Sequence, residues 1–122
     1  MANVLLCHSA CTTCARARAW LKARRIPFEE RPIREENPTA AELADWRGRS
    51  GLPLRRLFNT SGQRYRELGL SARLSDMSEQ EMLDLLASDG MLVMRPFLVT
   101  DSAVLVGFRE AEWAERLPEG GQ

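Results

Sequence analysis

Two cysteines three residues apart are the side chains of this chain best suited to chemistry. Cys11 and Cys14 form a C-x-x-C motif between an apolar run at residues 4–7 and a stretch with helical character at residues 15–23. A thiol at the junction of a strand and a helix faces unsatisfied backbone N–H groups and the positive end of the helix dipole, which favour the thiolate. A second thiol one helical turn later can attack a disulfide formed at the first. The motif therefore predicts a redox pair in which Cys11 attacks and Cys14, with the higher pKa, resolves.

The same spacing would also fit half of a zinc site, and this alternative has to be weighed. Structural zinc takes about four protein ligands, and only Cys7 and His8 remain nearby. Cys7 ends the apolar run and His8 follows it directly, so their side chains point to opposite sides of a strand, and the sequence has no second C-x-x-C and no H-x-x-H. We therefore favour the redox pair and expect no bound metal. We interpret Cys7 as a core residue and His8 as a hydrogen-bonded structural residue.

Composition limits the classes of function. The 122 residues are sufficient for about one domain, and 17 basic residues balance 17 acidic ones. Zero net charge gives no electrostatic case for direct nucleic-acid binding, and no run approaches the ~18 apolar residues of a membrane span. The N-terminus lacks the pattern of a signal peptide. We expect a cytoplasmic protein, where a close cysteine pair is more often catalytic or sensing than structural.

The hydrophobic pattern predicts an α/β fold. A strand at residues 3–7 and a strand at 28–33 flank the helix after the motif, which makes a βαβ unit with a parallel pair. The cysteines then lie at the carboxyl end of the first strand, where open α/β sheets place their sites. The remaining expected elements are a capped helix from Thr39 with Glu42 that Gly48 and Gly51 close, short helices at 52–57 and 65–70, a loop at 59–62, a capped helix from Ser78 with Glu81, a hairpin of 97–100 and 103–106, and a helix at 110–117.

Five segments, in this order, carry a resemblance to a known family. They are Cys11–Leu21, Ile26–Phe28, Tyr65–Leu70, Arg95–Phe97 and Val106–Phe108. The whole resembles a thioredoxin-like βαβ…ββα mixed sheet with a helical insertion, and more closely the ArsC/Spx (arsenate reductase-like) family. The resemblance implies one ArsC-type domain over residues 1–117 with the insertion at 36–90, and the composition of residues 118–122 predicts a flexible tail.

The resemblance also implies roles for individual residues. In this family the proline matching Pro96 is typically cis and lies beside the reactive cysteine, and the arginine matching Arg95 points toward the thiolate. Asn59 and Gly107 stand where arsenate reductases carry two further arginines, so the oxyanion site is depleted of cations.

The expected site residues are therefore Cys11, Cys14 and Arg95 as catalytic residues, with substrate contacts from Asn59, Pro96, Thr12 and Thr13. The chain looks closer to the Spx-like branch of the family than to true arsenate reductases.

Three functions follow in order of preference. The first is a thiol–disulfide oxidoreductase that acts on glutathione or a protein disulfide, binds no cofactor, and receives electrons from glutathione or thioredoxin. The second is an Spx-like redox-sensing regulator that binds RNA polymerase and makes no contact of its own with nucleic acid. The third is a glutathione-dependent arsenate reductase.

Overall fold

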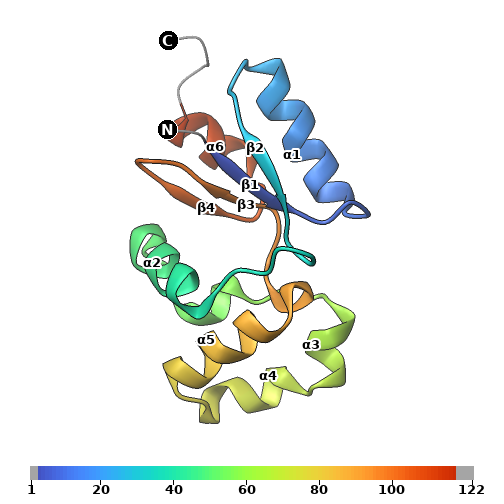
Figure 1. Ribbon diagram of the computed structural model, residues 1–122, viewed down its shortest axis with the longest axis vertical. Helices are drawn as coiled ribbons and strands as arrows, with labels where there is room; N and C mark the ends of the chain where they lie inside the picture. The colour runs from blue at the N-terminus through green and yellow to red at the C-terminus, as the bar shows by residue number, and fades with distance from the viewer. Residues whose placement is uncertain (1–2, 118–122) are drawn as a thin grey trace. The chain divides into compact units, whose positions relative to one another are not determined.

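The structure, a computed structural model, describes residues 3–117 and divides into two compact units. The first unit combines the two ends of the chain, up to Pro32 and from Arg95 onward, and the second is the segment Ile33–Met94 between them. The predicted tail at 118–122 lies outside the described residues. The first unit contains a mixed sheet and two helices, whereas the second is built from helices (Figure 1).

The sheet of the first unit has four strands in the order β2-β1-β3-β4. The strands are β1 (Val4–Cys7), β2 (Glu29–Pro32), β3 (Phe97–Val99) and β4 (Val104–Val106). β1 runs parallel to β2 and antiparallel to β3, and β3 runs antiparallel to β4. The predicted βαβ unit and hairpin are therefore confirmed, with strands one or two residues shorter than expected. β1 is paired on both sides, so its carboxyl end is firmly placed.

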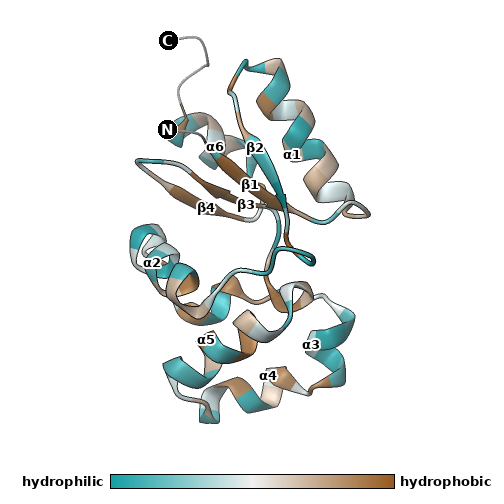
Figure 2. Cartoon of the chain, in the orientation of Figure 1, coloured by the Kyte–Doolittle hydropathy of each residue, from teal (hydrophilic) through white to brown (hydrophobic). Residues whose placement is uncertain are grey.

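One face of this sheet forms the core of the first unit. Leu5, Leu98 and Leu105 are neighbours across the three strands β1, β3 and β4, and they pack in one buried cluster with residues of α1 (Thr12–Ala23) and α6 (Glu110–Arg116). Both helices therefore cover the same face. Figure 2 shows that β1, β3 and β4 are hydrophobic, whereas the edge strand β2 is hydrophilic. A charged edge is a common protection against pairing with other chains.

Helix α1 begins earlier than the sequence pattern suggested. We expected helical character from residue 15, but the helix starts at Thr12 and Cys11 is its N-cap residue. The helix ends in a Schellman motif, in which the N–H of Ile26 donates to the carbonyl of Leu21 at 3.0 Å and Arg25 takes a left-handed conformation with φ 59°. Pro27 disfavours helical geometry at Ile26, but the helix already ends at Ala23, three residues earlier.

The second unit contains α2 (Ala40–Ser50) and α5 (Glu79–Ser88), which pack together. Both predicted capping boxes are confirmed, at Thr39 with Glu42 and at Ser78 with Glu81. Gly48 lies inside α2, so only Gly51, with φ 71°, closes the helix. Between the two helices lie η1 (Leu54–Leu57), α3 (Gln63–Glu67), α4 (Leu70–Arg73) and η2 (Leu74–Asp76), and η3 (Gly90–Leu92) follows α5.

Gly90 lies at a close approach between two backbone segments of the second unit. A Cβ atom at this position would overlap the carbonyl oxygen of Ile33 and crowd the side chain of Asn37. The side-chain amide of Asn37 in turn donates to the carbonyl of Ala87 at 2.7 Å. The backbone of residue 33 and the end of α5 are therefore locked around a position that only glycine fits.

We expect Gly90→Ala to destabilise the protein by roughly 1–3 kcal/mol, because the backbone must move to admit the methyl group. Gly48→Ala is the matched control. Its Cβ would meet no atom within 4 Å, and alanine inside a helix is favoured over glycine by roughly 0.5–1 kcal/mol. Urea unfolding of the three proteins measures both effects. Equal stability of Gly90→Ala and the wild type would contradict the close approach.

Candidate functional site

Cys11 lies where the chain passes from β1 into α1. Its backbone is extended, its N–H donates to the carbonyl of His8 at 3.0 Å, and its Sγ accepts the backbone N–H of Cys14 at 3.3 Å. The sulfur therefore takes the place of the oxygen that usually caps a helix, and it satisfies one of the free N–H groups of the first turn. The side chain is partly exposed. The Cys11 sulfur is therefore accessible from solvent, and it lies where the helix N-terminus stabilises negative charge.

Cys14 is the third residue of α1, in its first turn, and is completely buried. A hydrogen bond from the Cys7 thiol lowers the pKa of Cys14 to about 6. The backbone N–H of His8, the Cys11 thiol and the charge of Arg18 act in the same direction, and burial opposes them. The sequence predicts the higher pKa of the redox pair for Cys14. Helix-end arguments do not anticipate a lowered value, because they do not include a thiol contributed by the neighbouring strand.

Cys7 is the functional candidate that sequence reasoning missed. It is the last residue of β1 and is 1% exposed, which confirms its place in the core. The hydrogen bond with Cys14 raises its pKa well above the ordinary value, and burial adds to the effect. The sequence feature that could have identified Cys7 is its position in the strand. Leu5 and Cys7 are two residues apart in a strand, so they share the face that α1 covers.

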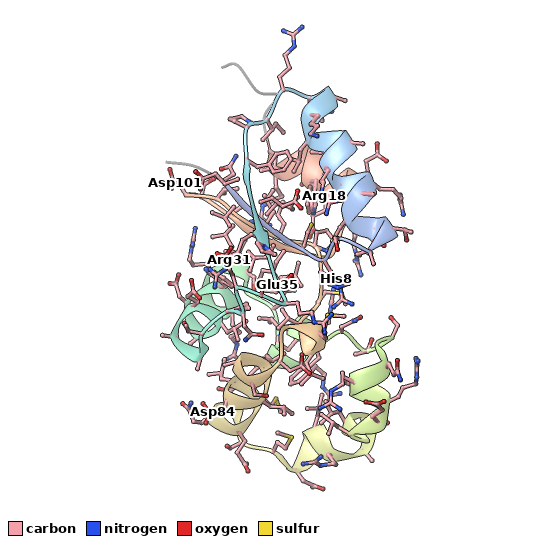
Figure 3. The ribbon with its side chains drawn as sticks, turned by 45° about the vertical axis from the view of Figure 1, so that its right-hand side comes forward. His8, Arg18, Arg31, Glu35, Asp84 and Asp101 are labelled. Atoms are coloured by element: carbon pink, nitrogen blue, oxygen red, sulfur yellow. The ribbon has the colours of Figure 1, made fainter. Side chains whose placement is uncertain are left out.

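Charged and polar groups frame the three sulfurs. Arg18 of α1 donates through Nε to the Glu30 carboxylate of β2 at 2.7 Å, and this hydrogen bond raises the pKa of Arg18, which therefore keeps its charge. The Nδ1 atom of His8 accepts the backbone N–H of Ala10 at 3.3 Å. Figure 3 shows His8 next to the end of β1 and Arg18 on α1. His8 is thus part of the turn, as expected for a structural histidine.

An aromatic cluster holds α1 in place. Trp20 of α1 packs edge-to-face against Phe108 and Trp113, at centroid distances of 6.1 and 6.0 Å, and Phe108 lies 4.9 Å from Trp113. Two arginines cover the rings: Arg16 of α1 lies over Phe108, and Arg24, the C-cap residue of α1, lies over Trp20. Each aromatic pair contributes about 0.5–1.5 kcal/mol beyond burial. They fix the helix whose first turn carries the cysteines.

The first unit also contains the segment around Pro96. The peptide bond between Arg95 and Pro96 is cis, as the family resemblance implies, and the Nε atom of Arg95 is buried. The N–H of Gly107 donates to the carbonyl of Pro96 at 2.8 Å, and the indole of Trp113 donates to the carbonyl of Gly107. Gly107 has φ 76°. Position 107 is therefore tied to the cis proline but provides no cation.

The other predicted site residues are distributed over both units. Thr12 is exposed and Thr13 is partly buried, both in the first turn of α1. Asn59 belongs to the second unit, where its backbone N–H donates to the carbonyl of Leu92 at 2.7 Å. The neighbouring Thr60 lines a cavity of about 350 Å³ together with Arg55, Arg56, Phe58, Tyr65, Ser71 and Met94. Substrate contacts from these threonines and from Asn59 remain predictions.

Neither a metal centre nor a membrane span is found in the described part of the chain. Over residues 3–117, no three side chains among His, Cys, Asp and Glu are grouped so that they could hold a metal ion. Within the same residues no helix combines the length and the apolar character needed to cross a bilayer.

The lowered pKa of Cys14 has a direct spectroscopic consequence. Thiolates absorb more strongly in the ultraviolet than thiols, so absorbance should rise through a step with a midpoint near pH 6 as the pH is raised. Below the midpoint Cys14 carries its proton, and above it the thiolate is present. We expect the step to survive in Cys11→Ser, whose hydroxyl can replace the thiol contact, and to vanish in Cys14→Ser. A step near pH 6 that persists in Cys14→Ser would contradict the assignment.

Comparison with known proteins agrees with this architecture. The model of the ArsC family matches residues 6–116. YusI of Bacillus subtilis (strain 168) is 46% identical over 108 residues, which are 88% of this chain and 92% of YusI. The global transcriptional regulator Spx of Enterococcus faecalis (strain ATCC 700802 / V583) is 30% identical over 89% of this chain and 81% of its own.

A solved structure confirms the fold. The crystal structure of an ArsC family related protein from Bacteroides fragilis is similar to this chain, with a TM-score of 0.91, 46% identity, and coverage of 94% of this chain and 98% of that chain. The thioredoxin-like fold with a helical insertion is thereby established, together with the predicted family. The chain belongs to the ArsC family.

Proposed function

We propose that this protein is a thiol–disulfide oxidoreductase that uses Cys11 and Cys14 as its redox pair. The observation that carries the proposal is the helix cap formed by the Cys11 sulfur, which accepts the N–H of Cys14 at 3.3 Å. The capping sulfur is partly exposed, whereas the second sulfur is buried directly behind it. One thiol is therefore accessible to a substrate, and the other can be reached through the first.

The reaction consists of two thiol–disulfide exchanges. Cys11 attacks one sulfur of a substrate disulfide, forms a mixed disulfide with it, and releases the other sulfur as a thiolate. The neighbouring Cys14 thiolate can accept the proton that Cys11 loses. Cys14 passes this proton to the released substrate thiolate, attacks the Cys11 sulfur as a thiolate, and releases the second substrate thiolate. The substrate has gained two electrons, and the protein is left with a Cys11–Cys14 disulfide.

The charges of the site support this sequence of steps. A pKa near 6 keeps Cys14 mostly deprotonated at neutral pH, so the resolving thiol needs no separate base. The helix N-terminus stabilises negative charge on Cys11 when it leaves a disulfide again. Glutathione or thioredoxin would return two electrons to the Cys11–Cys14 disulfide. Arg95 would stabilise the thiolate, while Pro96, Thr12 and Thr13 would contact the substrate.

A redox-sensing regulator is the second candidate. Its support is the 30% identity with the global transcriptional regulator Spx over most of both chains. In this function the Cys11–Cys14 disulfide would act as a switch that changes the affinity for RNA polymerase. The neutral net charge is compatible with it, because such a regulator need not bind nucleic acid itself.

Arsenate reduction is the third candidate, and the site argues against it. The glycine at position 107 adjoins Pro96 without offering a guanidinium group, and Asn59 offers an amide in place of a second cation. Charge-assisted hydrogen bonds are roughly twice as strong as neutral ones, so an arsenate dianion would be held weakly.

Turnover of the full-length protein tests the first candidate. In a coupled NADPH assay, with glutathione or thioredoxin systems as electron source and a model disulfide as acceptor, we expect steady turnover. We expect the turnover rate of Cys11→Ser to be at least a hundredfold lower, because the attacking sulfur is gone. Cys14→Ser should instead accumulate a mixed disulfide at Cys11, visible as a mass increase. A Cys11→Ser protein with full activity would refute the proposal.

The assay includes arsenate as a second acceptor. Little or no arsenate turnover is expected, for the charge reason given above. Arsenate turnover that depends on Arg95, measured with Arg95→Ala, would favour the third candidate instead.

Polymerase binding tests the second candidate. If the protein is a sensor, its affinity for purified RNA polymerase should change at least several-fold between the reduced and the oxidised form. Cys14→Ser, which cannot form the Cys11–Cys14 disulfide, should bind equally under both conditions. Equal binding of reduced and oxidised wild-type protein, measured by surface plasmon resonance, would refute this function.

A further inference from the structure

The third cysteine of the chain lies where two inward-facing patterns meet. In β1 the residues facing the core of the first unit are Leu5 and Cys7, and in α1 they are Cys14, Ala17 and Leu21. The last inward residue of the strand therefore meets the first inward residue of the helix. Both side chains are buried, Cys7 at 1% exposure and Cys14 at none. The strand and the helix each contribute one sulfur to a contact that is closed to solvent.

The two thiols belong to one buried cluster, and the hydrogen bond between them lowers the pKa of Cys14 and raises that of Cys7. Cys14 lies in the first turn of a helix and also accepts a hydrogen bond from the backbone N–H of His8. These donors favour negative charge on Cys14. Cys7 is a strand residue outside the helix end. The proton therefore stays on Cys7, and Cys7 donates to Cys14.

We propose that Cys7 is a positioning residue of the redox pair, whose buried S–H group holds Cys14 as the thiolate that resolves mixed disulfides at Cys11. This inference rests on the proposed oxidoreductase function. Cys7 forms and breaks no bond in the reaction, and its own thiol stays reduced throughout. It acts only through the sulfur of Cys14.

The hydrogen bond favours the reduced form of the pair. Cys14 carries negative charge as a free thiolate and none in the Cys11–Cys14 disulfide, so the S–H donor of Cys7 has a strong acceptor only in the reduced state. Stabilising the reduced form makes a cysteine pair more oxidising. Removing the donor should therefore slow resolution at low pH and make the reduction potential more negative.

A packing role is the alternative, and two substitutions separate it from donation. Cys7→Val fills the site, suits a strand and has no donor. Cys7→Ser keeps a donor but places a polar hydroxyl in the core. If Cys7 only packs, valine should preserve the redox behaviour and serine should impair it. If Cys7 donates, the order is reversed.

The experiment follows the reaction of the full-length reduced protein with a nitrobenzoate disulfide reagent. Each reacting protein molecule releases coloured thiolate twice. The first release reports the attack of Cys11, and the second reports resolution by Cys14. Stopped-flow traces over a range of pH give both rates for the wild type, Cys7→Val and Cys7→Ser. Circular dichroism confirms that each variant is folded, and Cys7→Ala, the smallest deletion of the thiol, replaces Cys7→Val if valine disrupts the fold.

We expect the second release in the wild type to titrate with a midpoint near 6. In Cys7→Val the midpoint should move toward the ordinary thiol value of about 8.5. Near pH 6 this change removes most of the thiolate, and the higher nucleophilicity of the more basic sulfur offsets part of the loss. The second release should therefore slow about tenfold there. Cys7→Ser should stay within about threefold of the wild type, and the first release should change little in both variants.

The outcomes separate the proposed function from the proposed role of Cys7. Absence of a second release in the wild type would overturn the proposed function itself. A normal second release in the wild type with an unchanged midpoint in Cys7→Val would leave that function intact and overturn the role of Cys7. Impairment by serine but not by valine would assign Cys7 to packing alone.

Discussion

The geometry of the site depends on one turn of backbone, in which the N–H of Cys11 donates to the carbonyl of His8 at 3.0 Å. This hydrogen bond ends β1 and starts α1 within four residues. It brings the Cys11 sulfur over the first turn of the helix and leaves Cys14 facing the sheet. A longer connection would separate the strand sulfur of Cys7 from the helix sulfur of Cys14. The short junction therefore produces three adjacent sulfurs that differ in exposure, hydrogen bonding and charge.

The rest of the first unit keeps this junction in place. β1 is paired on both sides, so its last residue cannot shift along the sheet without breaking two ladders. Trp113, completely buried, contacts Trp20 and Phe108 and links α1 to the segment after β4. The same indole donates to the carbonyl of Gly107, whose N–H reaches Pro96. Packing on the helix and the position of the cis-proline segment are therefore connected through a single side chain.

Structural features set by residues close in sequence were predicted well, whereas features that depend on tertiary contacts were missed. The capping boxes at Thr39 and Ser78 and the hairpin turn follow from side chains close in sequence, and all were predicted. The left-handed Arg25 was missed because glycine, not arginine, is the usual residue there. The lowered pKa of Cys14 was missed for a different reason. Its first cause is Cys7, seven residues away and on another element, and no spacing rule connects a strand end to that helix position.

Both proposed functions depend on the same event, oxidation of Cys11 and Cys14 to a disulfide. This oxidation would remove a negative charge from a completely buried sulfur at the start of a helix and join it to a partly exposed one. For an enzyme, this loss of charge sets the potential at which the disulfide is passed on. For a regulator, it changes the hydrogen bonds of the first helical turn and of the strand end. Under either proposal the three sulfurs would determine how readily the pair is oxidised, while the exposed surface around Cys11 would determine whether a disulfide substrate or a protein partner responds.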